Sequence, residues 1–196
     1  MTHPRHLLLT LMVFVGAVFL GVNAHRGYAA SIDEGRLRQL QAAFVLNFMK
    51  FTHWPDQDEH PLRVLVLNNN TFATTLGGLT HERHVQNRPV EVHTHPPLPT
   101  HDAHDDTWNT YLATATQFDV IYAHADRGAA FQRLARATTL QPILLIADQP
   151  QGIAHGSMLA LGLEEGKVVF HAGRRAIDTS PLTLRAQLLK LARMHE

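Results

Sequence analysis

Apolar positions between residues 37 and 55 predict a long helix buried in the protein core. One set of apolar side chains recurs every three or four residues, which is the spacing of a helix face. This set is Leu37, Leu40, Phe44, Phe48 and Phe51. A second set fills most of the opposite face: Ala42, Val45, Leu46 and Met49. Exposing such side chains costs roughly 1.5–3 kcal/mol each, so the helix has to be covered. We expect Pro55 to end it, because proline disfavours helical geometry at the preceding residue.

The following segments alternate between short apolar runs and helical spacing. The runs predict strands at 62–67, 88–93, 118–122 and 142–147. The segments between them predict three helices. The first has Asn70 as its cap and carries Phe72, Leu76 and Leu79. The second runs from Trp108 to Thr116, and the third continues from an Asp126 cap to Ala137. Gly77-Gly78 is expected to weaken or end the first of these helices. The strand at 88–93 begins beside a proline, which is typical of a sheet edge.

The C-terminal third changes pattern. Two strands, 157–163 and 167–171, flank the turn residues 164–166 and predict an antiparallel hairpin. Ser180-Pro181 resembles a helix start, and the last helix would bury Leu184, Leu188 and Leu191. Together the elements predict a single α/β domain, a mostly parallel sheet flanked by helices with an antiparallel hairpin near the C-terminus.

The N-terminus predicts export from the cytoplasm. Arg5 precedes an apolar run from Leu7 to Val22, and small residues ending at Ala24 or Ala29 fit a signal-peptidase site. We therefore expect a signal peptide over 1–30, cleaved near 24–30, and a folded domain over 31–196 in a bacterial periplasm. An uncleaved membrane anchor is the alternative, although the apolar run is shorter than the ~20 residues of a typical span.

Composition and motifs exclude several chemistries. Seventeen basic and 17 acidic residues leave no net charge that would favour nucleic acid, and the absence of cysteine excludes disulfides and thiolate sites. No phosphate-binding glycine loop follows a strand, and no GxSxG elbow is present. Asp119, His124 and Asp148 lie near strand ends, where we expect them to cap turns. The sequence predicts neither an enzyme nor an organic cofactor.

Histidines are the strongest candidate for chemistry. Six of the 15 lie between residues 81 and 104. The candidate metal ligands are His93, His95, His101 and His104, of which the first two would share one face of a strand. Zinc or copper(II) would accept this donor set. The alternative is a solvated polar segment, because Pro96-Pro97 intervenes and no fixed ligand spacing appears.

The helix also carries a family resemblance. The run from Ala42 to Pro55, AAFVLNFMKFTHWP, closely resembles the AAFLYNFAKFTEWP hallmark of the YfiR-like family of periplasmic proteins. Further matches follow in order along the chain: Arg63–Leu67, Arg88–Val90, Phe118–Tyr122, Ile143–Asp148, Gly156–Met158, Val168–Phe170 and Leu188–Ala192. The resemblance thus covers essentially the whole predicted mature chain.

This resemblance implies an exported, non-enzymatic protein with a Rossmann-like sheet, often a homodimer. The best-known members, which are repressors of the YfiR/HmsC type, bind the periplasmic domain of an inner-membrane diguanylate cyclase and hold it inactive. This repression limits cyclic di-GMP and biofilm. Other relatives accompany sensor kinases or outer-membrane receptors. A periplasmic small-ligand or metal-binding sensor, using the histidine segment or a pocket at the sheet end, is the alternative function.

Departures from the family pattern are expected to matter. Without cysteine, this chain lacks the disulfide control of some members, and the family's Phe-x-x-Asn reads as Phe170 to Gly173. The histidine segment is not a family feature. Phe51 and Trp54 are candidates for a partner interface or pocket, because aromatic residues are enriched at binding hot spots. The alternative, which we favour, is that Trp54 anchors the core.

Overall fold

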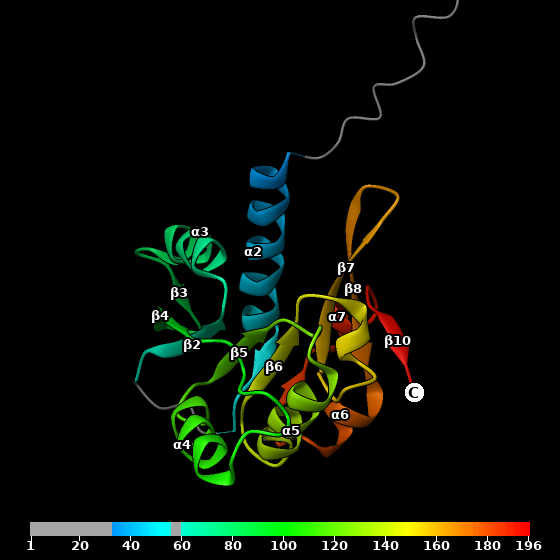
Figure 1. Cartoon of the computed structure of the whole chain (residues 1–196). Coiled ribbons are helices and arrows are strands. Elements are labelled where there is room, and N and C mark those ends of the chain that lie inside the picture. Colours follow the sequence, from blue (N-terminus) through cyan, green and yellow to red (C-terminus); the bar gives the residue numbers. More distant parts are fainter. Residues whose placement is uncertain (1–32, 56–59) are drawn as a thin grey trace, which may run out of the picture. The chain divides into compact units, whose positions relative to one another are not determined.

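An eight-stranded sheet forms the centre of the computed structural model, which describes residues 33–55 and 60–196 (Figure 1). Its strand order is β10-β8-β7-β6-β5-β2-β4-β3. The strands are β2 (Leu62–Leu67), β3 (His84–Val85), β4 (Arg88–His95), β5 (Val120–Ala123), β6 (Leu144–Ala147), β7 (Leu159–Glu164), β8 (Lys167–Gly173) and β10 (Arg193–His195). All neighbours are parallel except β3–β4 and β7–β8. The predicted α/β class, with its antiparallel hairpin, is confirmed. The predicted signal peptide lies outside the described residues.

The two faces of the sheet carry separate apolar layers. One face contacts α2 (Glu34–Lys50) and α3 (Asn70–Thr80), and the other contacts α4 (Asp105–Ala115) and α5 (Gly128–Thr138). Neighbouring residues of the central strands alternate between them, so that Tyr122 lies in the first layer and Ile121 in the second. The sheet is therefore buried on both faces, as parallel sheets are.

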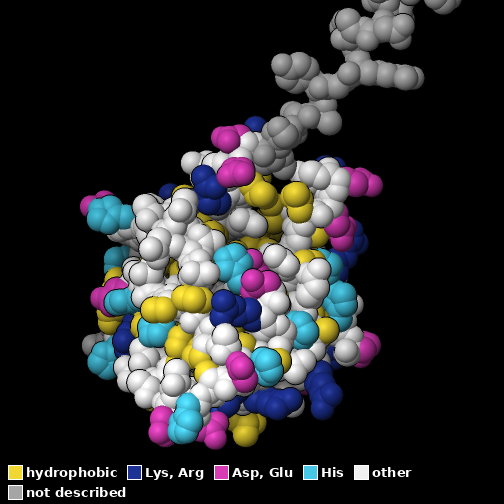
Figure 2. Space-filling model, viewed as in Figure 1, with side chains coloured by type: hydrophobic (Ala, Val, Ile, Leu, Met, Phe, Trp, Pro, Cys, Tyr) yellow, Lys and Arg dark blue, Asp and Glu magenta, His cyan; other side chains and the backbone are white. Residues whose placement is uncertain are grey.

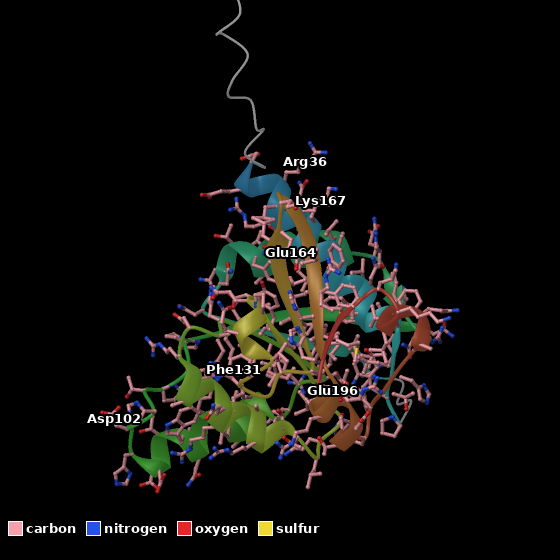
Figure 3. The ribbon with its side chains drawn as sticks, turned by 90° about the vertical axis from the view of Figure 1, so that its right-hand side faces the viewer. Arg36, Asp102, Phe131, Glu164, Lys167 and Glu196 are labelled. Atoms are coloured by element: carbon pink, nitrogen blue, oxygen red, sulfur yellow. The ribbon has the colours of Figure 1, made fainter. Side chains whose placement is uncertain are left out.

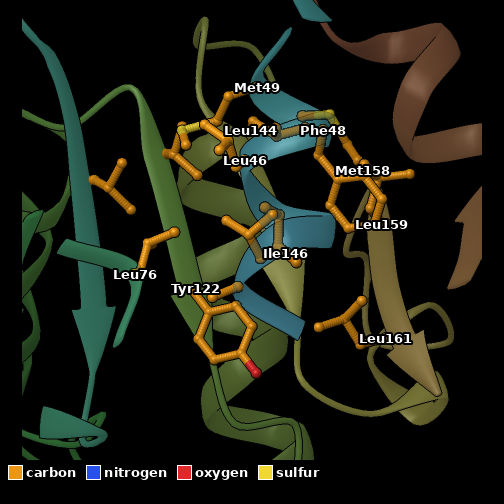
Figure 4. Packing of buried hydrophobic residues seen from close by; sticks show 14 of the residues in the cluster. Leu46, Phe48, Met49, Leu76, Tyr122, Leu144, Ile146, Met158, Leu159 and Leu161 are labelled. Carbon is orange, nitrogen blue, oxygen red and sulfur yellow. The ribbon is translucent and has the colours of Figure 1, made fainter. Parts of the chain in front are cut away.

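Helix α2 is the main cover of the first layer. Its buried residues Leu46, Phe48 and Met49 face the central strands, where Figure 4 shows them with Leu144, Ile146 and Leu159. The Phe48 ring lies 5.0 Å from that of Phe170 on β8. The predicted buried helix is thus confirmed, although Leu40 remains 39% exposed near the N-terminal end.

Pro55 does not end this helix, contrary to the sequence prediction. The helix ends at Lys50, and the next residues form β1 (Thr52–His53), which pairs antiparallel with β9 (Thr183–Leu184). The Thr52 hydroxyl donates to the Phe48 carbonyl at 2.8 Å, which satisfies one of the free carbonyls at the helix end. Strand pairing with a segment far along the chain therefore sets the helix end.

The predicted C-terminal helix is also wrong. Ser180 follows the end of α6 (Arg174–Thr179), and the chain then forms β9, the four-residue helix α7 (Ala186–Leu189) and strand β10. Leu184 and Leu188 are buried as expected, whereas Leu191 is 77% exposed. Pairing of β9 with β1 and of β10 with β8 replaces the continuous helix.

The other predicted helices are confirmed with shifted ends. Helix α3 is capped by Asn69 rather than Asn70, because the Asn69 side chain accepts the Phe72 N–H. The helix continues through Gly77-Gly78 to Thr80, so the glycines do not end it. Helix α4 begins three residues before Trp108, and α5 has Arg127 rather than Asp126 at its N-cap. A short 3₁₀ turn, η1 (Pro150–Gly152), links β6 to β7. The β7–β8 hairpin turns at Glu165 and Gly166, whose φ angles of 49° and 75° are typical of tight hairpin turns.

Candidate functional site

The carboxyl ends of the parallel strands bring several polar residues together. Asn68 follows β2, His124 follows β5 and Asp148 follows β6, and these three strands are neighbours in the sheet. In α/β proteins with parallel sheets, ligands bind at this edge because loops and helix N-termini converge there. The sequence placed Asp148 and His124 at strand ends but did not bring them together.

His124 and Asp148 form a hydrogen-bonded pair. The imidazole Nδ1 of His124 contacts Oδ2 of Asp148, and the other carboxylate oxygen accepts the Ala125 backbone N–H at 3.0 Å. The hydrogen bond that the His124 imidazole donates to the Asp148 carboxylate raises the pKa of His124, while partial burial opposes the shift. Asp148 therefore caps the turn after β5, as expected from the sequence, and also favours a protonated imidazole.

Two cavities flank Arg127 beside this pair. A cavity of about 60 Å³ is lined by Asn68, His124, Asp126 and Arg127 together with apolar residues. A wider one of about 290 Å³ is lined by Arg127, His101 and the first residues of α5. The guanidinium Nη1 of Arg127 donates to the Leu98 carbonyl at 2.9 Å, which holds the loop after β4 against α5. This edge offers both cationic and anionic groups to a small polar ligand.

Sequence reasoning missed Arg127. Its position depends on the loop from Pro96 folding over the start of α5, a contact between segments about thirty residues apart in the chain. The available signal was an arginine next to Asp126, the cap that the sequence predicted for the helix after β5. That signal was too common to single the residue out.

Asp119 lies at the other end of the parallel strands, just before β5 begins. Its carboxylate accepts the Arg63 backbone N–H at 2.7 Å and forms an ion pair with Arg88 at 3.1 Å. Arg88 also donates to the carbonyl of His60 at 2.7 Å. These contacts join the beginnings of β2 and β4 to the residue before β5, so Asp119 has the structural role expected of it.

The histidine segment spreads over strand, loop and helix. His93 and His95 lie on the same face of β4, where their rings contact Phe118 and Tyr111 at centroid distances of 5.3 and 4.6 Å. His101 lies in the exposed loop, and His104 caps α4 by accepting the Asp106 N–H at 3.4 Å. The neighbouring Asp102 points outward from the molecule (Figure 3).

No three potential ligands gather for a metal ion within residues 33–55 and 60–196. Figure 2 shows histidine side chains dispersed over the visible face. The zinc or copper site of His93, His95, His101 and His104 stays a prediction, which would require the loop after β4 to move toward the strand.

The two aromatic candidates differ in burial. Trp54 is only 4% exposed and belongs to the core cluster beneath α2, while Phe51 is half-buried at the helix C-cap. The indole Nε1 of Trp54 is buried without a hydrogen-bond partner among the described residues. The geometry favours a packing role for Trp54 over direct contact with a partner.

The fold and site define an α/β protein with a Rossmann-like sheet and a small polar site at its carboxyl edge. The chain belongs to the YfiR/HmsC-like family, whose sequence model matches residues 38–193. This family is periplasmic and is known for regulators of diguanylate cyclases, which supports a regulatory role. In the part of the chain that the structure describes, no helix is both long and apolar enough to cross a membrane.

A solved structure supports the fold. It is a conserved domain protein from Vibrio cholerae O1 biovar El Tor str. N16961, with a TM-score of 0.51 and 13% sequence identity. The match covers 81% of this chain and 60% of that protein, so the present chain spans about 60% of its length. A search of curated protein sequences finds no match.

Proposed function

We propose that this protein is an exported repressor of a membrane-bound diguanylate cyclase. The observation that carries the proposal is the family match over residues 38–193, which includes the whole of the folded unit except its ends. The protein would bind the periplasmic part of the cyclase and hold it inactive. A sensor kinase is the second partner class that the family resemblance suggests.

Binding can be tested with a tagged copy expressed from its own locus. After crosslinking in intact cells, purification should recover a membrane protein that carries a cyclase domain. A secreted control protein with the same tag should not recover it. Recovery of a kinase instead would redirect the proposal to that partner class, and recovery of no signalling protein would contradict it.

A second candidate function is the sensing of a small polar ligand. The observation that favours it is the pair of cavities beside Arg127, at the edge where α/β proteins bind ligands. Screening small polar metabolites by thermal shift should identify a compound that stabilises the protein but not its Arg127→Ala variant. Equal stabilisation of both forms would place the ligand elsewhere.

Metal sensing by the histidine segment is tested separately. Titration calorimetry with zinc or copper(II) at neutral pH should give stoichiometric binding that a His93→Ala/His95→Ala variant loses. Weak heat that is unchanged in the variant would contradict a metal role for these side chains.

A further inference from the structure

Strand β10 covers one margin of the sheet. It pairs in parallel with β8, from Arg193 beside His171 to His195 beside Gly173 (Figure 1). At the other margin, β3 pairs with only the start of β4, and no other strand among the described residues covers the rest of that edge. An unpaired strand edge is a template for further pairing. The attachment of β10 therefore decides whether β8 forms a second open edge.

Apolar burial contributes little to this attachment. Arg193, Met194 and His195 are all exposed. The preceding residue, Ala192, is partly buried against the first apolar layer, so the core contact of this segment ends just before β10 begins. Because burial of apolar surface is the main stabilising term in folded proteins, β10 depends on its backbone pairing and its side-chain contacts.

Two side-chain contacts join β10 to the β7–β8 hairpin. Nη2 of Arg193 lies 3.0 Å from Oε2 of Glu164, but both side chains are exposed, and such ion pairs contribute little to stability. Nδ1 of His171 lies 2.8 Å from Nε2 of His195. His171 is 9% exposed, so the imidazole pair is the contact that involves a buried side chain.

Strand β7 leaves room for the buried imidazole. A Cβ added at Gly162 would lie 2.9 Å from Nε2 of His171 and 3.1 Å from Cγ of Pro150. Any larger residue at Gly162 would therefore displace the ring or the proline. The absence of a side chain at this position lets the ring lie against β7 while its Nδ1 contacts His195.

The contact between the two imidazoles depends on their protonation. A neutral imidazole has one N–H donor and one acceptor nitrogen, whereas an imidazolium ion has two donors and no acceptor. One ring can therefore donate to the other across 2.8 Å as long as at least one of them is neutral. When both rings are protonated, two N–H groups and two positive charges face each other, and the hydrogen bond is lost.

The surroundings of His171 disfavour its charged form. Burial lowers its pKa, positive charge on His195 and Arg193 lowers it further, and Glu164 opposes these effects. The residues of β7 and the 3₁₀ turn that lie against the ring, Gly162 and Pro150, carry no charge. Since the folded protein binds this proton less tightly than the free imidazole does, the stabilisation is present above the ordinary pKa of 6.5 and is lost as the pH falls through the lowered value.

We propose that protonation of both imidazoles at acid pH releases β10 from β8 and opens the edge of β8. The released state brings the charged His171 into contact with water and separates it from the charge on His195. The remaining contacts are the backbone pairing and the exposed ion pair of Arg193. This inference does not depend on the proposed repression of a cyclase.

Hydrogen exchange followed by mass spectrometry tests the release of β10 in the purified protein. Peptides that contain Arg193–His195 report on β10, and peptides that contain Leu144–Ala147 report on the central strand β6. After correction for the intrinsic effect of pH on exchange, protection of β10 should fall about tenfold or more between about pH 7.5 and about pH 5, while β6 stays protected. Unchanged protection of β10, or an equal loss in β6, would overturn the proposal.

The variant His195→Gln assigns the pH response to the imidazole pair. A glutamine amide can donate to a neutral His171 or accept from a charged one, so the hydrogen bond persists at either pH. Protection of β10 in this variant should change by less than about twofold over the same range, whereas the control His101→Gln, in an exposed loop, should respond as the wild type does. A full response in His195→Gln would contradict the proposed release mechanism.

Discussion

The protonation of His124 is linked to folding through Asp148. The carboxylate raises the pKa of His124 above its ordinary value of 6.5, so the folded state binds the proton more tightly than the unfolded chain does. The stabilisation is fully present below the ordinary pKa and is lost as the pH rises through the raised value. At acid pH the folded state of the wild-type protein is therefore more stable relative to that of a variant without this imidazole.

This linkage predicts a pH-dependent difference in melting temperature. The wild type should exceed His124→Gln most at pH below 6.5, and the difference should shrink as the pH rises above it. His101→Gln is the control, because that side chain lies in the exposed loop. A difference that grows with pH would show that Asp148 does not stabilise the charged imidazole.

Substitution of Trp54 distinguishes a packing role of this side chain from a role in a partner interface. Because its side chain is 4% exposed within the core cluster, Trp54→Ala should lower the free energy of unfolding by about 3–5 kcal/mol. Denaturant unfolding followed by circular dichroism measures this loss. A variant with wild-type stability that no longer represses signalling would assign Trp54 to the partner interface instead.

At the scale of elements, alanine substitutions of two leucines test the structure of the C-terminal segment, where the sequence wrongly predicted a continuous helix. The structure predicts a large loss of stability for one leucine and a small loss for the other. Leu188 is 5% exposed on α7, whereas Leu191 is 77% exposed beyond it. Leu188→Ala should cost about 2–5 kcal/mol of unfolding free energy, and Leu191→Ala less than about 0.5 kcal/mol. Similar losses for both variants would instead support the continuous helix, since its apolar face would bury both side chains.

Helix α2 and the C-terminal segment show which parts of the fold the sequence could predict. The interior of α2 and the central strands were predictable because their apolar periodicity reports burial within one segment. The end of α2 was not, because Thr52 pairs with Leu184 from a distant part of the chain. Ser180-Pro181 matched a helix start locally, but the pairing of β9 and β10 overrides that preference.

The candidate site was predictable only in its parts. His124 and Asp148 could be placed after strands, but their contact requires β5 and β6 to be neighbours. The contribution of Arg127 depends on a loop that folds over α5. The open edge of β4 likewise follows from sheet order, because Pro89 indicated an edge strand without showing how much of the strand stays unpaired.

At the scale of the whole molecule, the fold combines a buried sheet with exposed surfaces that suit binding. A sheet covered on both faces supports α2, and the exposed features are an open strand edge and small polar cavities. These features suit binding and sensing. The family match over residues 38–193 supports a regulatory role, and repression of cyclic di-GMP synthesis is the effect that we propose.

Cyclic di-GMP in intact cells tests this central claim most directly. Deleting the gene should raise the nucleotide, and expressing the wild-type protein in the deletion strain should lower it again. Expression of the same protein in a strain that also lacks the captured cyclase should have no effect. Unchanged cyclic di-GMP after deletion, measured under conditions where the protein and the cyclase are both present, would contradict the account.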